Sequence, residues 1–122
     1  MSDDILGKVR ITQLDCAPLT LRPGETCALT FAVTSRATDT HTVWLGASAQ
    51  DQAGAYHFNV EEDVVVTLAP GEQLFSRALT IPRTAAPGVY RVVGALWLGA
   101  KSQPDASECL AVLDRGAILT VA

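Results

Sequence analysis

The stretch TCALTFAVT, residues 26–34, is the clearest indication of the fold class because its apolar side chains recur at every second position. Its odd-numbered residues, from Cys27 to Val33, share one face of an extended chain, since successive side chains on a strand point to opposite sides. The turn RPGE at residues 22–25 comes directly before it. The pattern predicts a β-strand with one face turned toward a core.

Comparable short segments follow one another along the chain, separated by turn residues such as PGE at residues 70–72 and DQAG at residues 51–54. No loop contains the amphipathic helix of about a dozen residues that a parallel α/β fold requires. We therefore expect an all-β, immunoglobulin-like antiparallel sandwich of about seven to nine strands with Greek-key connections. The other expected strands span residues 8–15, 41–50, 55–60, 64–68, 73–81, 88–98, 108–113 and 117–121.

Length and composition predict a folded domain over residues 8–122, preceded by a tail at residues 1–7. The chain has 122 residues, of which 48% are hydrophobic and 18% charged, so it has enough apolar surface to offset its ordering entropy. A net charge of -4, with two lysines and scattered arginines, argues against a nucleic-acid partner. No apolar run approaches the length of about 18 residues needed for membrane insertion.

Three cysteines, Cys16, Cys27 and Cys109, stand at wide spacings and lack any CxxC pair. An odd number of separated cysteines favours reduced thiols over disulfides. Together with the absence of a signal peptide at the given start, this leads us to expect a cytoplasmic location, or an extracellular one if the sequence is an excised domain.

Two segments carry a family resemblance: LAPGE at residues 68–72 and APGVYRV at residues 86–92. They resemble bacterial immunoglobulin-like and fibronectin-like modules, in which such segments introduce two of the longer strands. The resemblance implies an immunoglobulin-like sandwich with the ring of Tyr90 packed inward and its hydroxyl on nearby backbone. Because Val92 stands where antibody-type domains have a cysteine, it also implies that the inter-sheet disulfide is missing.

The order of the DQAG turn, Tyr56, Phe58, the second PGE turn and Tyr90 is similar to the sugar-binding domains of some O-antigen export ATPases. It is also similar to the intracellular proteinase-inhibitor domains of bacilli. Neither resemblance rests on a motif that is diagnostic of function.

No catalytic group, metal site or cofactor is predicted, and we expect the protein not to be an enzyme. His41 and His57 lie in no nucleophile-activating context, so we expect solvated or edge histidines. The acidic run at residues 61–63 lacks the spacing of a calcium loop and is expected to be a solvated turn. Cys27 falls on the apolar face of its strand, where a thiol is inert.

Aromatic residues give the most specific hypothesis about binding. If Val43 and Leu45 face the core, Trp44 points the other way, and Trp97 and Arg91 do the same on residues 88–98. We therefore expect Trp44, Trp97 and Arg91, together with Tyr56, to be binding residues on an outer sheet surface. The alternative keeps Trp44 inside, as the core tryptophan typical of this fold.

Three functions remain open. The first is a non-catalytic interaction module that contacts a protein partner or self-associates, because edge strands of a sandwich can accept another strand. The second is carbohydrate binding through the surface aromatic residues. The third is proteinase inhibition through an exposed loop at residues 82–87 or 99–107.

Overall fold

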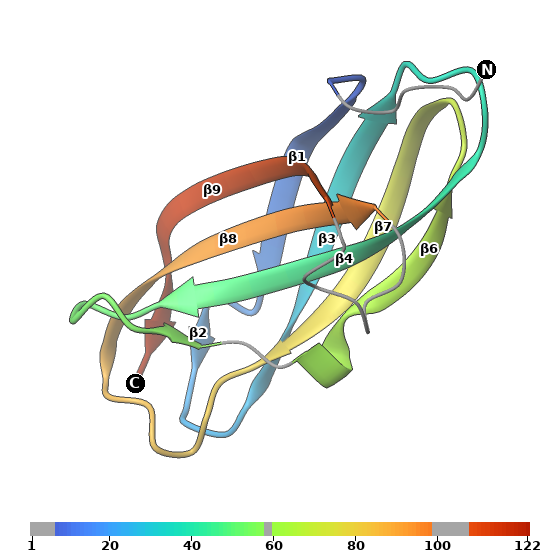
Figure 1. Ribbon diagram of the computed structural model, residues 1–122. Helices are drawn as coiled ribbons and strands as arrows, with labels where there is room; N and C mark the ends of the chain where they lie inside the picture. Colours follow the sequence, from blue (N-terminus) through green and yellow to red (C-terminus); the bar gives the residue numbers. More distant parts are fainter. Residues whose placement is uncertain (1–6, 58–59, 99–107) are drawn as a thin grey trace.

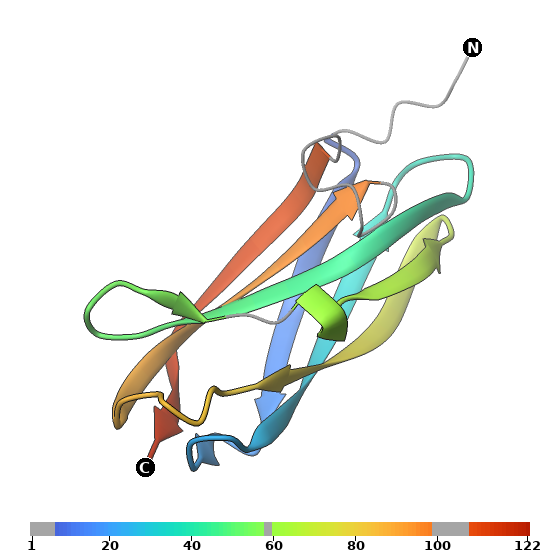
Figure 2. The same cartoon turned by 60° about the horizontal axis from the view of Figure 1, so that its bottom comes forward.

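The chain folds into two β-sheets packed face to face, as seen in the computed structural model, which describes residues 7–57, 60–98 and 108–122 (Figures 1 and 2). One sheet has three antiparallel strands and the other has six. The expected all-β sandwich is thus confirmed. The smaller sheet has the order β1 (Val9–Ala17), β3 (Thr26–Ser35), β7 (Gly71–Thr80). The larger sheet has the order β2 (Thr20–Leu21), β9 (Glu108–Val121), β8 (Gly88–Leu98), β4 (His41–Gln50), β5 (Tyr56–His57), with β6 (Val64–Leu68) also paired to β4.

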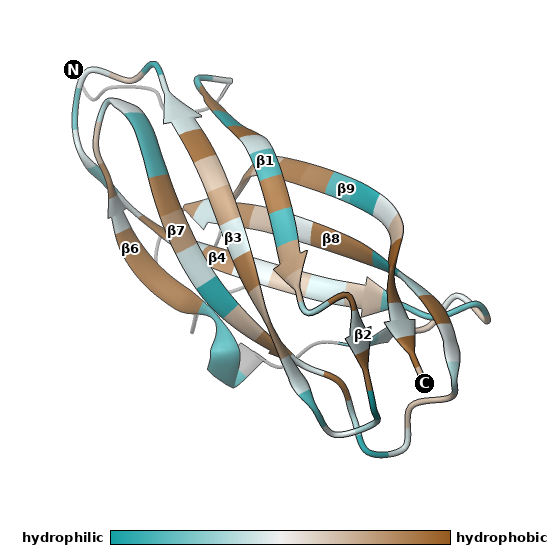
Figure 3. Cartoon of the chain, turned by 180° about the vertical axis from the view of Figure 1, so that it is seen from behind, coloured by the Kyte–Doolittle hydropathy of each residue, from teal (hydrophilic) through white to brown (hydrophobic). Residues whose placement is uncertain are grey.

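The core lies between the two sheets and is built from alternate residues of each. From β3, Leu29, Phe31 and Val33 are fully buried, as the period-two pattern predicts. Figure 3 shows strongly hydrophobic residues, in brown, alternating with less hydrophobic ones along this strand. A glycine accommodates the largest of these side chains, because a Cβ added at Gly94 of β8 would lie 2.6 Å from Phe31 Cε2. Both sheets therefore meet over a closely packed interior.

Tyr90, at the start of β8, lies as the family resemblance implies. Its side chain is 1% exposed, and its hydroxyl donates a hydrogen bond to the carbonyl of Ala86 at 2.6 Å. Burial, followed by the negative charge of Asp51, raises the pKa of the phenol. The ring thus belongs to the core while its polar end is satisfied by backbone.

Two of the expected strands at the C-terminus are one continuous strand, β9. Residues 114–116, which the pattern predicts as a break between them, instead form a bulge: Val92 pairs with Gly116 and Val93 with Asp114, so that Arg115 has no opposite partner. Gly116 adopts a φ of +77°, which a glycine tolerates without strain. Residues 114–116 do change the direction of the chain, but they bend β9 and do not end it.

The region around residues 55–62 differs from the expected strand. Only Tyr56–His57 pairs with β4, and a short 3-10 helix, η1 (Val60–Glu62), follows. Residues 58 and 59 lie outside the described part of the chain. The pattern also missed β2, whose two residues pair in parallel with Thr120 and Val121. Two-residue pairings have too little periodicity to be visible in a sequence.

The acidic run is not the expected solvated turn. Asp63 is buried and accepts hydrogen bonds from Arg77 Nε at 3.0 Å and from Nη2 at 2.7 Å. Glu62 accepts two more from Thr80, one from the backbone amide at 2.9 Å and one from the hydroxyl at 2.7 Å. These contacts attach η1 to β7 and explain why Arg77 stands among the apolar residues of its strand. A buried guanidinium needs such a partner, because an unpaired buried charge is costly.

Within the described ranges, no helix is long and apolar enough to cross a membrane.

Candidate functional site

The outer face of the six-stranded sheet, the surface turned away from the core, carries the residues that the sequence singled out for binding. Trp44 is the direct cross-strand partner of Trp97, and Gln50 is the partner of both Arg91 and Tyr56. Directly opposed side chains lie on the same side of a sheet. Trp44 and Gln50 are six positions apart along β4, a distance of about 20 Å. The structure therefore divides the predicted set into two regions of one face.

The first region is a row of directly opposed residues across four strands, Val65, Trp44, Trp97 and Cys109, called here the tryptophan row. The two indoles stack with ring centroids 5.4 Å apart and planes inclined by 17°. Gly46 makes room for them, since a Cβ added there would lie 3.3 Å from Trp97 Nε1. The indoles thus turn toward each other rather than forming a flat, open platform.

The two tryptophans differ in exposure. Trp44 is only 6% exposed although it lies outside the core between the sheets, whereas Trp97 is partly exposed. Val65 and Val112 are 46% and 59% exposed, and both lie on this same face. The row is consequently an apolar surface of which Trp97, and not Trp44, offers the accessible aromatic ring.

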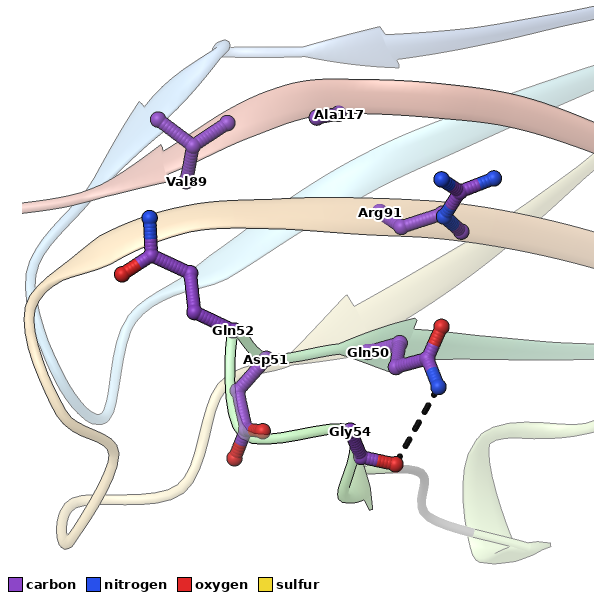
Figure 4. A pocket seen from close by; sticks show the side chains of 7 residues that line it. All are labelled: Gln50, Asp51, Gln52, Gly54, Val89, Arg91 and Ala117. Atoms are coloured by element: carbon purple, nitrogen blue, oxygen red, sulfur yellow. Dashed lines mark hydrogen bonds between the residues drawn. The ribbon is translucent and has the colours of Figure 1, made fainter.

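The second region is a hollow of about 410 Å³ at the end of the same face, between the β4–β5 hairpin and the neighbouring strands β8 and β9 (Figure 4). We call it the hairpin pocket. Figure 4 shows Gln52 extending from the hairpin toward β8, beside Val89. The pocket is lined by Gln50, Asp51, Gln52, Gly54, Val89, Arg91 and Ala117.

Hydrogen bonds hold two of these polar groups in place. Gln50 Nε2 donates to the carbonyl of Gly54 at 3.1 Å, and Arg91 Nη1 donates to Asp114 Oδ2 at 2.7 Å. The bond from Arg91, followed by that from the Gly116 amide, lowers the pKa of Asp114. The guanidinium of Arg91, which lines the pocket, is therefore oriented by a carboxylate that lies outside the lining.

The side chain of Gln52 packs against the backbone of Gly88. Only a glycine allows this approach, because a Cβ added at Gly88 would be 3.0 Å from Gln52 Oε1. Within residues 7–57, 60–98 and 108–122, its amide makes no hydrogen bond, so both its donor and its acceptor face the pocket. Val89, which is 40% exposed, supplies an apolar wall beside it.

Asp51 organises the hairpin that carries these glutamines. Its Oδ1 accepts the backbone amides of Ala53 at 3.0 Å and Ala55 at 2.9 Å, and its Oδ2 lies 2.8 Å from His57 Nε2. The bond with His57, then the amide of Ala55, lowers the pKa of Asp51. An aspartate that binds the amides that follow it is typical of tight turns. The sequence DQAG therefore predicted the turn, whereas no sequence motif predicted the contact between Asp51 and His57.

His57 lies on β5 at the edge of the sheet, as expected of an edge histidine, but it is not simply solvated. Its side chain is 23% exposed and is held by the carboxylate of Asp51. On its other side, the ring lies 5.8 Å from that of Tyr90, which belongs to the core. His57 thus links the turn to the interior.

The thiols lie at two different places. Cys16 and Cys27 are buried on adjacent strands, and all three cysteines are free. The hydrogen bond with Cys16, together with burial, raises the pKa of Cys27, in keeping with an inert core thiol. Cys109 is exposed at the end of the tryptophan row. Across the described ranges, no three His, Cys, Asp or Glu side chains gather as metal ligands would.

The loops considered for proteinase inhibition are only partly described. In residues 82–87, the amide of Ala85 donates to the carbonyl of Pro82 at 3.0 Å, and its side chain is buried. The hydrogen bond closes a turn within the loop, and the buried side chain of Ala85 joins the loop to the core. Residues 99–107 lie outside the described part of the chain.

No protein-family model matches the chain, and no curated protein matches its sequence. Solved structures share its fold at low sequence identity. The C-terminal domain of Wzt superposes with a TM-score of 0.69 at 14% identity, covering 99% of this chain and 77% of that one. A calcium-binding mutant of Bacteroides uniformis β-glucuronidase 2 gives 0.65 at 13% identity, covering 93% and 15%. A putative β-galactosidase from Bacteroides fragilis gives 0.61 at 13%, covering 88% and 17%. The chain thus corresponds to most of the domain in the first case and to about one sixth of the glycosidases.

Proposed function

We propose that this protein is a non-catalytic carbohydrate-binding module whose ligand occupies the hairpin pocket. The observation that carries the proposal is the convergence of Gln50, Gln52 and Arg91 on one hollow of about 410 Å³. Small-molecule sites are typically hollows of about 300–1,000 Å³ with a few convergent polar groups on apolar walls. Similarity to domains of two glycosidases agrees with a module that accompanies sugar chemistry without performing it.

The polar groups suit sugar hydroxyls in particular. A hydroxyl both donates and accepts, and the side-chain amide of Gln52 offers both functions at fixed spacing. Arg91 keeps N–H groups beyond the one bonded to Asp114, while Asp114 is an acceptor beside it. Neighbouring hydroxyls of a pyranose can be bound by such a donor and acceptor pair.

Tyr56 does not line the pocket but is the cross-strand neighbour of Gln50, which does. It is 56% exposed and stands opposite Gln50 at the edge of the sheet. An exposed ring next to polar groups can pack on the apolar face of a sugar. This assigns to Tyr56, rather than to the stacked indoles, the stacking role in the proposed site.

The test is a titration with a panel of neutral and acidic oligosaccharides, followed by two variants, Gln52→Ala and Arg91→Ala. We expect each variant to weaken binding at least tenfold, about 1.4 kcal/mol, because each removes hydrogen bonds to the ligand. The matched controls are Gln13→Ala, on the exposed face of β1, and Arg22→Ala, in the turn before β3. A panel without any binder, or variants that bind as tightly as the controls, would refute the proposal.

A second candidate function is contact with another protein, including a second copy of this chain, through the tryptophan row. It is favoured by the exposed apolar residues Val65, Trp97 and Val112 on one face. Apolar groups clustered on a surface are typical of interaction sites. Val112→Asp should then abolish any self-association seen by sedimentation, whereas Leu74→Asp, on the opposite sheet and 68% exposed, should not.

A further inference from the structure

A cluster of basic residues lies on the other side of the molecule, on the outer face of the three-stranded sheet. The amide of Arg36 donates to the carbonyl of Lys8 at 2.8 Å, and Arg10 is the direct partner of Thr34. Lys8 and Arg10 are two residues apart, as are Thr34 and Arg36, so all four side chains point to the same side. This two-by-two group, Lys8, Arg10, Thr34 and Arg36, is called here the basic array.

The array borders a hollow of about 260 Å³, which Thr12 completes. Thr12 is two residues beyond Arg10 and so lies on the same face, and a bulge begins there: Ile11 pairs with Val33 and Gln13 with Ala32, so that Thr12 has no opposite residue. Its hydroxyl donates to the carbonyl of Ala32 at 3.2 Å, which leaves the oxygen as an acceptor. A bulge of this kind bends the strand and increases its twist, here next to the hollow.

Three of the nine basic residues of the chain meet in this array although the net charge is -4. The sequence suggested scattered arginines, since positions 10 and 36 are far apart along the chain, and only the pairing of β1 with β3 unites them. Like charges directly opposite one another on a sheet are destabilising. Among the described residues, the guanidinium of Arg10 has no hydrogen-bond or ion-pair partner, and that of Arg36 reaches only the carbonyl of Gly7 at 3.4 Å.

Within the part of the chain that the structure describes, one acidic residue stands opposite a member of the array. Glu72 of β7 is the direct partner of Thr34 and occupies the same face. Its single negative charge faces two positive charges, those of the Arg10 and Arg36 guanidinium groups that line the hollow. An anionic ligand would supply strong acceptors to the guanidinium groups of Arg10 and Arg36, which make at most one weak hydrogen bond among the described residues.

We propose that the basic array is a binding site for a phosphate-type oxyanion, a doubly charged tetrahedral group that is either free or attached to a small molecule. Arginine binds such groups through two parallel N–H donors, and the hydroxyl of Thr34 adds a further donor. The site is independent of the carbohydrate pocket. Figures 1 and 2 show the start of β1 and the end of β3 at one end of the sandwich, with the β4–β5 hairpin at the other.

The test is a nuclear magnetic resonance titration of the full chain with sodium phosphate, with sodium sulfate, and with sodium chloride at matched ionic strength. We expect saturable shifts at Arg10, Thr12, Thr34 and Arg36 with phosphate and sulfate at millimolar concentration, and none with chloride. A parallel titration with glucose 1-phosphate and glucose distinguishes a free anion from an attached group. A tighter response to the sugar phosphate than to phosphate would identify the attached form.

Variants make the assignment specific. Arg10→Gln with Arg36→Gln should weaken phosphate binding at least tenfold, Arg10→Lys should retain part of it, and the matched control Arg22→Gln should retain all of it. Thr34→Val, which keeps a β-branched side chain in the strand, should weaken it less. Thermal unfolding of each variant verifies that it is folded.

Three outcomes would overturn the proposal. The first is a response to chloride equal to that with phosphate, which would reflect screening alone. The second is phosphate binding that is unchanged in the double variant. The third is binding of a single-stranded oligonucleotide far tighter than that of phosphate, with a steep salt dependence, because that would indicate a nucleic-acid surface instead.

Discussion

The indoles of Trp44 and Trp97 are stacked across two neighbouring strands, 5.4 Å between centroids, on the side of the sheet that faces away from the core. Their exposures differ, since Trp44 is 6% exposed and Trp97 is partly exposed. We expect iodide to quench the fluorescence of Trp97 and to leave Trp44 largely unquenched. Trp97→Phe should therefore remove most of the quenchable emission, and Trp44→Phe should remove the protected part. Equal quenching of both indoles would contradict this arrangement.

Replacing one partner of the ion pair between Arg77 and Asp63 should lower the stability of the protein strongly. Both side chains are buried, with exposures of 0% and 6% and a separation of 2.7 Å. Arg77→Met leaves an uncompensated buried carboxylate, so the free energy of unfolding should fall by about 3–5 kcal/mol. Urea denaturation measures it.

The double variant Arg77→Met with Asp63→Leu serves as the comparison for this ion pair. Because it removes both charges, it should recover much of the loss, as apolar replacements of buried ion pairs commonly do. A double variant that is less stable than Arg77→Met alone would show that Asp63 contributes mainly through its other contacts with the chain.

The carboxylate of Asp51 predicts a dependence of stability on acid. Hydrogen bonds from His57 and from Ala55 lower its pKa below the ordinary value of 3.8, so the folded state favours the ionised form. Its stabilisation is therefore complete above about pH 4 and is lost as the pH falls through the folded pKa. The melting temperature of the wild type should exceed that of Asp51→Asn at neutral pH, and the difference should shrink below that range.

His57→Gln provides the second half of the Asp51 experiment. In that background Asp51 has lost the partner that lowers its pKa most. The difference in melting temperature caused by Asp51→Asn should then change less with pH than it does in the wild type. A difference that depends on pH just as strongly without His57 would assign the effect to the backbone amides alone.

We expect that the core has no room for an added methyl group at Gly94 of β8. A Cβ there would lie 2.6 Å from Phe31 Cε2 and 3.0 Å from Leu14 Cδ2. Gly94→Ala should lower the free energy of unfolding by about 1–3 kcal/mol, because overpacking forces neighbouring side chains to move. Phe31→Leu in the same chain should relieve part of the strain, and chemical denaturation of both variants measures it. Additive losses from the two substitutions would show that the two sites do not interact.

Much of the fold could be predicted because alternation is a local property. The strands at residues 41–50, 64–68 and 88–98 have the predicted bounds. The prediction was wrong at residues 114–116 because the same residues serve a turn and a bulge, and only the pairing with β8 distinguishes them. It was also wrong for the acidic run, since Arg77 becomes the partner of Asp63 only when η1 packs on β7.

The candidate sites show the same division. The two-residue period of a β-strand was enough to predict that Trp44, Trp97 and Arg91 point away from the core. That the indoles stack, and that Trp44 is shielded, followed from the register between β4 and β8. The hairpin pocket and the basic array could not be predicted, because each joins residues from segments that only strand pairing brings together.

The sequence alone determines which side chains of each strand face the core, because their orientation depends on a two-residue period and on burial of apolar surface. Which charges become neighbours, as Arg10 and Arg36 do, and which polar groups converge, as Gln52 and Arg91 do, depends on the assembled sandwich. Register and sheet order result from the sum of many contacts between distant segments, whereas the facing of a side chain is set within its own strand.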